Sequence, residues 1–189
     1  MKFKVAIDPG HSVNTAGKRC LKSLDSNETR EWLLNSRIAD ILCGMVKMYP
    51  DIEILRTDDI TGLTDVSLTE RCKRANDFKA DLFISIHHNA GINGGSGGGC
   101  VVYTWNGLHK TEAQKLYNLT IAQTGLKGNR SEHIGAGNFS VLKYTNMPAF
   151  LIEEGFMDSS TDIKKILTDD FAYQCAKGLL DFILWYKDK

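Results

Sequence analysis

Short apolar runs rich in β-branched residues alternate with longer amphipathic stretches along most of this chain. The expected strands cover residues 3–8, 52–56, 82–87, 100–104, 139–143 and 149–153. The expected helices cover about residues 31–48, 67–79, 109–125 and 169–187, with a short one near 161–167. Strands that are apolar on both faces and alternate with helices are typical of a largely parallel sheet covered by helices on each side. The alternation therefore predicts an α/β fold over 1–189, a single domain whose mostly parallel, twisted sheet has about six strands.

Charge and hydropathy exclude two classes of partner. The chain has 23 basic and 23 acidic side chains, so its formal net charge is zero, and it has no polybasic segment. This balance argues against a nucleic-acid partner held mainly by charge. No apolar stretch reaches the roughly 18 to 20 residues that a membrane helix needs, so we expect no membrane partner. The first expected strand begins at residue 3, which predicts synthesis in the cytoplasm without a signal peptide.

Three ionisable side chains stand where core-type strands end. His11 follows the first strand in VAIDPGH, His87 ends the third in SIHHNA, and Glu153 ends the last in LIEEGF. Because ligands of open α/β sheets bind beyond the carboxyl ends of the strands, we expect these groups to converge at one edge of the sheet. Glu154 is a second acid beside Glu153, but adjacent residues of a strand point to opposite faces, so only one of them can point into the site.

Two imidazoles with carboxylates predict a zinc site. Zn²⁺ accepts nitrogen and oxygen ligands, whereas Mg²⁺ and Ca²⁺ prefer shells of oxygen. A catalytic zinc usually has three protein ligands, and the third would be a carboxylate near the same edge. The run NETREW offers Glu28 and Glu31 where the first helix begins. A carboxylate in a first helical turn also has an ordinary explanation in the helix dipole, and the residues alone leave the choice open.

Sequence blocks distributed over nearly the whole chain are similar to those of one known family. The blocks are VAIDPGH, EWLLN, LRTDD, SLTERCKRAN, DLFISIHHNA and MPAFLIEEGFM. In these blocks the chain resembles the zinc-dependent N-acetylmuramoyl-L-alanine amidases of the amidase-3 type, which occur in bacterial autolysins and phage endolysins. The departures are Ser12 after DPGH, where the family usually has glycine, Leu55 where threonine is usual, and the additional acid Glu154.

The resemblance implies hydrolysis of the amide that joins the lactyl group of N-acetylmuramic acid to L-alanine in peptidoglycan. It implies Zn²⁺ as cofactor with His11, Glu31 and His87 as ligands, which selects Glu31 over Glu28. It also implies that Glu153 is the catalytic carboxylate, which takes a proton from water and delivers it to the leaving amine. We expect a monomer without a separate wall-binding domain, and it would reach the cell wall after lysis or export.

Residues that contact the substrate are harder to predict. Asn89 lies two positions beyond His87 and either binds substrate, orients a ligand or satisfies loop backbone groups. Trp105 flanks the glycine-rich run GINGGSGGG, and Asn138 lies in a polar connection before the penultimate expected strand. Aromatic and polar side chains suit sugars and peptides, so we expect these three residues to line the cleft. Arg71 is expected to pair with a carboxylate on a facing loop.

Three other functions are compatible with the residues. A non-catalytic peptidoglycan-binding module on the same fold would need neither the full ligand set nor Glu153. A peptidase that cuts a different peptidoglycan bond is a second alternative, although the chain lacks HExxH. A cysteine hydrolase would use Cys20 or Cys100 and would resist a chelator. The five cysteines show no CxxC spacing, so we expect neither a disulfide framework nor a cysteine-based zinc site.

Overall fold

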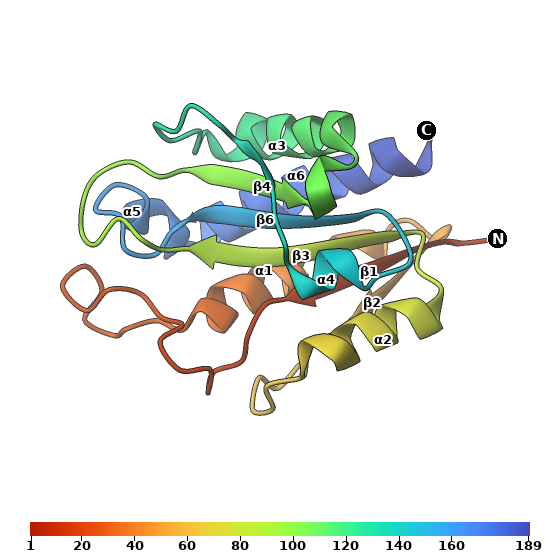
Figure 1. Cartoon of the computed structure of the whole chain (residues 1–189), viewed down its shortest axis with the longest axis horizontal. Coiled ribbons are helices and arrows are strands. Elements are labelled where there is room, and N and C mark those ends of the chain that lie inside the picture. The colour runs from red at the N-terminus through yellow and green to blue at the C-terminus, as the bar shows by residue number, and fades with distance from the viewer.

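A six-stranded sheet organises the computed structural model, which describes residues 1–189. Its strands are β1 (Phe3–Pro9), β2 (Ile52–Arg56), β3 (Leu82–Asn89), β4 (Cys100–Thr104), β5 (Ile134–Ala136) and β6 (Ala149–Phe156). They lie in the order β2-β1-β3-β6-β4-β5, and only the β4–β6 pairing is antiparallel. The predicted α/β fold with a mostly parallel sheet of six strands is therefore confirmed (Figure 1).

Helices cover both faces of this sheet. They are α1 (Glu31–Val46), α2 (Leu68–Phe78), α3 (Lys110–Thr124), α4 (Ser140–Lys143), α5 (Ile163–Ile166) and α6 (Asp169–Lys187), with a 3₁₀ turn η1 at Trp105–Gly107. Figure 1 shows α2 and α4 in front of the sheet and α1 and α6 behind it, and α3 packs against α6 on that rear side. None of these helices combines the length and the apolar character needed to cross a bilayer.

The strands are apolar on both faces because each face has its own core. A core of 31 buried residues joins one face of the sheet to α1, α3 and α6, and it includes Val5, Ile7 and Ile84. A second core of nine buried residues joins the other face to α2 and α4, and it includes Ala6 and Phe83. Successive residues of β1 and β3 thus enter opposite cores, as the alternation of side chains along a strand requires.

The strand predicted at residues 139–143 is wrong. Residues Ser140–Lys143 form the single helical turn α4, and the sixth strand is β5, which pairs with β4 at the edge of the sheet. Val141 and Leu142 are adjacent and both belong to the smaller core. A strand would direct two adjacent side chains to opposite faces, whereas a helical turn keeps them on one side. Such a short apolar run carries too little periodicity to distinguish the two structures.

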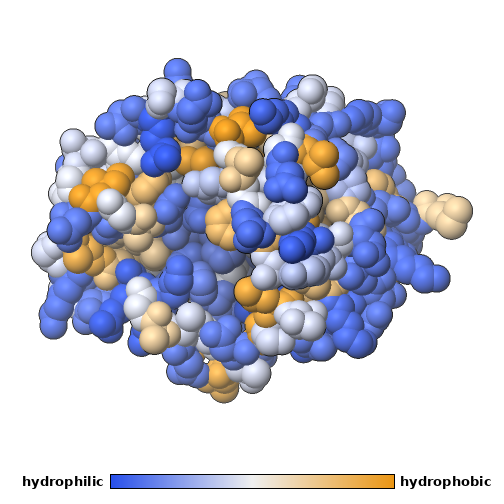
Figure 2. Space-filling view, in the orientation of Figure 1, coloured by the Kyte–Doolittle hydropathy of each residue, from blue (hydrophilic) through white to orange (hydrophobic).

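The remaining surface mixes polar and apolar residues. On the face shown in Figure 2, orange hydrophobic patches are interrupted by blue hydrophilic residues. Exposed large apolar side chains occur singly or in small groups, among them Ile60, Leu63 and Leu108. Scattered apolar residues of this kind are normal on a protein surface, so this face offers no extended apolar area.

Candidate active site

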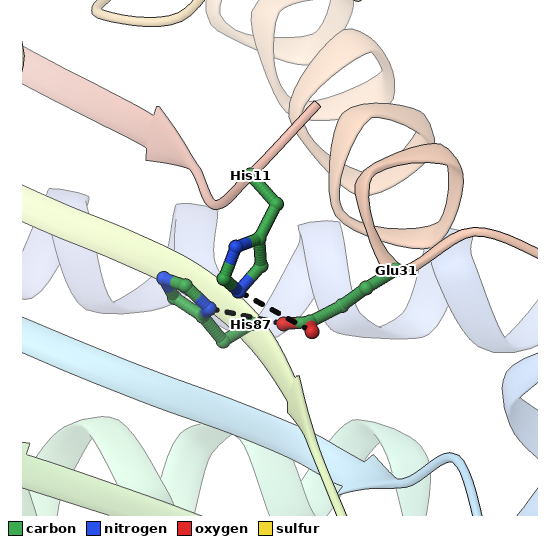
Figure 3. A group of neighbouring side chains, drawn as sticks. All are labelled: His11, Glu31 and His87. Atoms are coloured by element: carbon green, nitrogen blue, oxygen red, sulfur yellow. Dashed lines mark hydrogen bonds and ion pairs between the residues drawn. The ribbon is translucent and has the colours of Figure 1, made fainter. Parts of the chain in front are cut away.

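His11, Glu31 and His87 come together at the edge of the sheet where β1 and β3 end. One potential ligand atom from each lies within 4.8 Å of the others. The Nε2 atom of His11 lies 3.3 Å from Oε2 of Glu31, and the Nδ1 atom of His87 lies 3.0 Å from Oε1. Figure 3 shows the three side chains pointing toward one another from the turn after β1, from the start of α1 and from β3. The two imidazole rings are 4.9 Å apart between centroids, so the group is compact enough to surround one ion.

The turn that carries His11 is unusual and tightly held. The φ angle of His11 is 68°, a left-handed conformation that is uncommon for residues other than glycine. The buried guanidinium of Arg71 donates to the carbonyl oxygens of Pro9 at 2.6 Å and of His11 at 2.7 Å, and to the Asp8 carboxylate at 2.9 Å. The nearest carboxylate partner of Arg71 is therefore Asp8 in β1, whereas Asp65, in the loop before α2, lies 3.9 Å from the guanidinium. These bonds hold the turn on both sides of Gly10.

Gly10 is the residue that lets the two histidines approach. A Cβ atom at this position would lie 2.0 Å from the Cε1 atom of the His87 ring, far inside any van der Waals distance. Only a residue without a side chain therefore fits between the turn and the ring. The sequence DPGH thus contributes both a ligand candidate and the space for its neighbour.

Glu31, and not Glu28, faces the imidazoles. Glu31 is the first residue of α1, and its side chain is only 1% exposed. Its backbone N–H donates to the carbonyl oxygen of Lys18 at 3.1 Å, and its Oε1 atom accepts from the backbone N–H of His88 at 3.2 Å. The carboxylate of Glu28 instead forms an ion pair with Arg19 at 3.4 Å.

The environment of these three residues fits a metal ion. The Nε2 atom of His11 and the Oε2 atom of Glu31 are buried and make no hydrogen bond. Buried polar atoms without a partner are costly, which points to a group that would occupy both. Burial opposes ionisation of Glu31, but the neighbouring His11 and His87 side chains outweigh it and hold the pKa of this carboxyl far below its ordinary value. An anionic oxygen and two imidazoles form a donor set that suits Zn²⁺.

Glu153 lies directly beside this group. It is the register partner of His87 in the β3–β6 pairing, and its Oε2 atom is buried without a hydrogen bond. Burial raises the pKa of its carboxyl to about 7, although the charge of His87 opposes the shift. A carboxyl that titrates near neutral pH can both accept and return a proton. The adjacent Glu154 points into the opposite side of the sheet, where it is 1% exposed near Cys100 and Cys175.

The residues lie at the junction of a two-armed cleft. The larger arm has a volume of about 600 Å³ and extends toward the first turns of α2 and α4, where Leu68 and Ser140 line it. The smaller arm has a volume of about 350 Å³ and extends past Gly17. Three residues line both arms, and they are Lys18, His87 and Glu153. An extended substrate can therefore pass across the junction with a part in each arm.

The predicted substrate residues lie at different distances from this junction. Asn89 lines the smaller arm, next to His87 in the chain. Trp105 lines a separate pocket of about 260 Å³ and is absent from both arms. Asn138 lines neither arm, whereas the following residue, Phe139, lines the larger one. The contacts of all three with substrate stay predictions.

Lys18 and Phe139 line the cleft, although the sequence patterns do not predict either of them there. Lys18 lies in a long loop between β1 and α1, and nothing local in the sequence marks it. The sequence predicts Phe139 in a core strand, but its side chain is 37% exposed. An apolar aromatic residue beside Asn138 in a polar connection was the signal that could have identified it.

The sequence of this chain is similar to those of known proteins. Residues 5–184 match the family model Amidase_3, described as N-acetylmuramoyl-L-alanine amidase. The N-acetylmuramoyl-L-alanine amidase CwlM of Bacillus licheniformis is 34% identical over 178 residues, which are 93% of this chain. The chain spans 65% of the length of that relative.

Two solved structures are similar over the whole chain. The catalytic domain of the amidase CwlV from Bacillus (Paenibacillus) polymyxa var. colistinus has a TM-score of 0.87 and 29% identity, and the match covers 100% of this chain and 99% of that one. The N-acetylmuramoyl-L-alanine amidase from Clostridium difficile 630 has a TM-score of 0.87 and 31% identity, with coverage of 100% and 98%. Both solved structures thus share the fold of this chain along its whole length.

Proposed function

The chain belongs to the N-acetylmuramoyl-L-alanine amidase family Amidase_3, and from this premise we propose that it hydrolyses peptidoglycan. The bond cleaved is the amide between the lactyl group of N-acetylmuramic acid and the L-alanine of the stem peptide. One observation carries the proposal. Two imidazoles and a buried carboxylate converge within 4.8 Å, beside a second carboxylate at the junction of a two-armed cleft.

The proposed cofactor is Zn²⁺, with His11, Glu31 and His87 as its ligands. The nature of the donor atoms and the two buried atoms without hydrogen bonds support this assignment. When bound, such an ion would lower the pKa of a water molecule to about 7 and polarise a carbonyl group.

Glu153 is the proposed catalytic acid and base. As the water oxygen bonds to the carbonyl carbon, Glu153 accepts a water proton, and the π electron pair of the carbonyl moves onto its oxygen. When that pair returns, the carbon–nitrogen bond breaks, and Glu153 gives the proton to the departing nitrogen. The products are a carboxylate on the lactyl group and a free amine on L-alanine. A pKa of about 7, raised mainly by burial, supports both halves of this cycle.

We propose that residues 1–189 act as one catalytic domain and as a monomer. Both hydrophobic cores pack against the same sheet, which supports a single folding unit. The cell wall is the proposed place of action. A relative from Staphylococcus aureus that is 30% identical over 158 residues is named "Probable cell wall amidase LytH", which supports that place.

Digestion of purified peptidoglycan, with product analysis by mass spectrometry, tests the function. We expect zinc-loaded protein to release intact stem peptides that begin with a free L-alanine amine, and we expect EDTA to abolish the release. Muropeptides cut at another bond would indicate a peptidase instead. Activity that persists in EDTA would favour a thiol hydrolase, and a protein that binds peptidoglycan without releasing products would be a binding module.

A further inference from the structure

We propose that Lys18 is a catalytic residue, which donates a hydrogen bond to the negatively charged oxygen that develops on the scissile carbonyl. This inference rests on the proposed amide hydrolysis and adds a group to it. In this role Lys18 exchanges no proton with the substrate. Its role is to stabilise the pair of electrons that the carbonyl oxygen holds between attack of water and departure of the amine.

Lys18 stands at the point in the cleft where the reacting bond has to lie. It lines both arms, and the only other residues that do so are His87 and Glu153. Because Glu153 must reach both the water and the departing nitrogen, the scissile amide has to lie at this junction. A side chain that lines only one arm would face a more distant part of the substrate.

The backbone of Lys18 is fixed to the helix that carries Glu31. The carbonyl oxygen of Lys18 accepts from the Glu31 backbone N–H at 3.1 Å. The next residues continue this pairing, with an antiparallel bridge between Arg19 and Arg30. The loop between β1 and α1 is thus anchored directly beside the start of α1. Lys18 therefore has a defined position relative to the group of potential metal ligands, unlike a lysine on an unsupported loop.

The ammonium group of Lys18 has N–H donors that are available for a hydrogen bond to substrate. Its Nζ atom lies 3.9 Å from Oε2 of Glu31, which is an ion-pair distance but too long for a hydrogen bond. The Lys18 side chain is 46% exposed, so its Nζ atom can turn within the cleft. A divalent cation on Glu31 would offset the attraction of that carboxylate and leave the ammonium free to donate to an anionic oxygen of the substrate.

Arg71, the other permanent cation of the cleft, has no such freedom. Its guanidinium is buried and donates to the carbonyl oxygens of Val66, Pro9 and His11 and to the carboxylate of Asp8. Moving it to a substrate would break several buried hydrogen bonds. Lys18 is therefore the cationic side chain of the cleft that can respond to charge formed during the reaction.

Substitution of Lys18 by methionine separates this role from ground-state binding. Methionine keeps an unbranched apolar chain but lacks the charge and the donors. Loss of one oxyanion donor typically lowers kcat by about 10² to 10³. We expect this loss in Lys18→Met and in a second neutral variant, Lys18→Gln, with KM within about twofold of wild type. Lys18→Arg keeps the charge, so its kcat should be at least about tenfold higher than that of Lys18→Met.

The substrates are soluble muropeptides, released from peptidoglycan by a glycosidase, and the same muropeptides with their carboxylates converted to amides. An oxyanion donor predicts the same loss of kcat on both. If Lys18→Met instead raises KM at unchanged kcat, or loses activity only on the unmodified muropeptides, Lys18 binds a substrate carboxylate and the proposal is wrong. Wild-type kinetics in both neutral variants would also overturn it.

Three controls keep the outcomes distinct. Lys22→Met removes an exposed lysine of the same loop that lines neither arm, and it should behave like wild type. Zinc content by elemental analysis and thermal unfolding should be unchanged in Lys18→Met; loss of zinc would mean that Lys18 only positions Glu31. If the wild-type protein itself releases no peptides with an L-alanine amine, the proposed function fails and not merely the role of Lys18.

Discussion

Glu154 should make the stability of this protein fall as the pH rises. Its carboxyl group is 1% exposed, and neither oxygen makes a hydrogen bond. Burial raises its pKa from 4.5 to about 8; the neighbouring Cys175 thiol opposes this shift and Glu153 reinforces it. Between these two values the folded protein keeps the proton of Glu154, whereas the unfolded chain loses it. The unfolded state is therefore increasingly favoured as pH increases through this window.

The size of this effect follows from the difference between the two pKa values. From 4.5 to about 8, at 1.4 kcal/mol for each pH unit, the full effect is about 5 kcal/mol. Over the experimentally convenient range from pH 5 to pH 8, roughly 3 to 4 kcal/mol of it should be measurable. This is a large part of the roughly 5 to 15 kcal/mol by which a typical domain is stable.

Glu154→Gln replaces the carboxyl by a neutral group of nearly the same shape. We expect the variant to gain about 3 to 4 kcal/mol relative to wild type between pH 5 and pH 8, measured by urea unfolding in EDTA. Glu53→Gln, at an exposed position of β2, is the matched control and should follow the wild-type pH dependence. If wild type and Glu154→Gln lose stability in parallel across this range, Glu154 does not hold a proton in the fold, and the reasoning from burial is refuted.

Other substitutions test the site itself. Glu153→Gln should keep its zinc but lose about 10² to 10⁴ in turnover, and substantial remaining activity on muropeptides would remove Glu153 from the acid–base role. His11→Ala and His87→Ala should each lose bound zinc in elemental analysis, and full zinc occupancy would show that the ligand set is different. Gly10→Ala places a Cβ atom against the His87 ring, so it should lower the free energy of unfolding in urea by about 1 to 3 kcal/mol and also weaken zinc binding. If both quantities are unchanged, the turn can relax to accept the Cβ atom.

Several features of this protein follow from local sequence patterns. The alternation of apolar runs with amphipathic stretches predicts a sheet with helices on both faces. It can do so because the strand and helix periodicities are properties of the backbone. Parallel neighbouring strands end at one edge of the sheet, so the sequence alone predicts that His11, His87 and Glu153 lie close together. Strand alternation also separated Glu153 from Glu154, which indeed occupy opposite sides of β6.

Other features of the fold and of the site depend on contacts between segments that are far apart in the sequence. Residues Ser140–Lys143 form a helical turn because Val141 and Leu142 both pack in the core under α2 and α4, which a four-residue pattern cannot reveal. The residue pattern alone does not decide whether Glu28 or Glu31 joins the two histidines. The pairing of the Lys18 loop with the start of α1 is what directs Glu31 to the imidazoles. Loops lack a periodic hydrogen-bond pattern, so their paths depend on what they pack against. For that reason the cleft, and the lysine at its junction, emerge only in the folded chain.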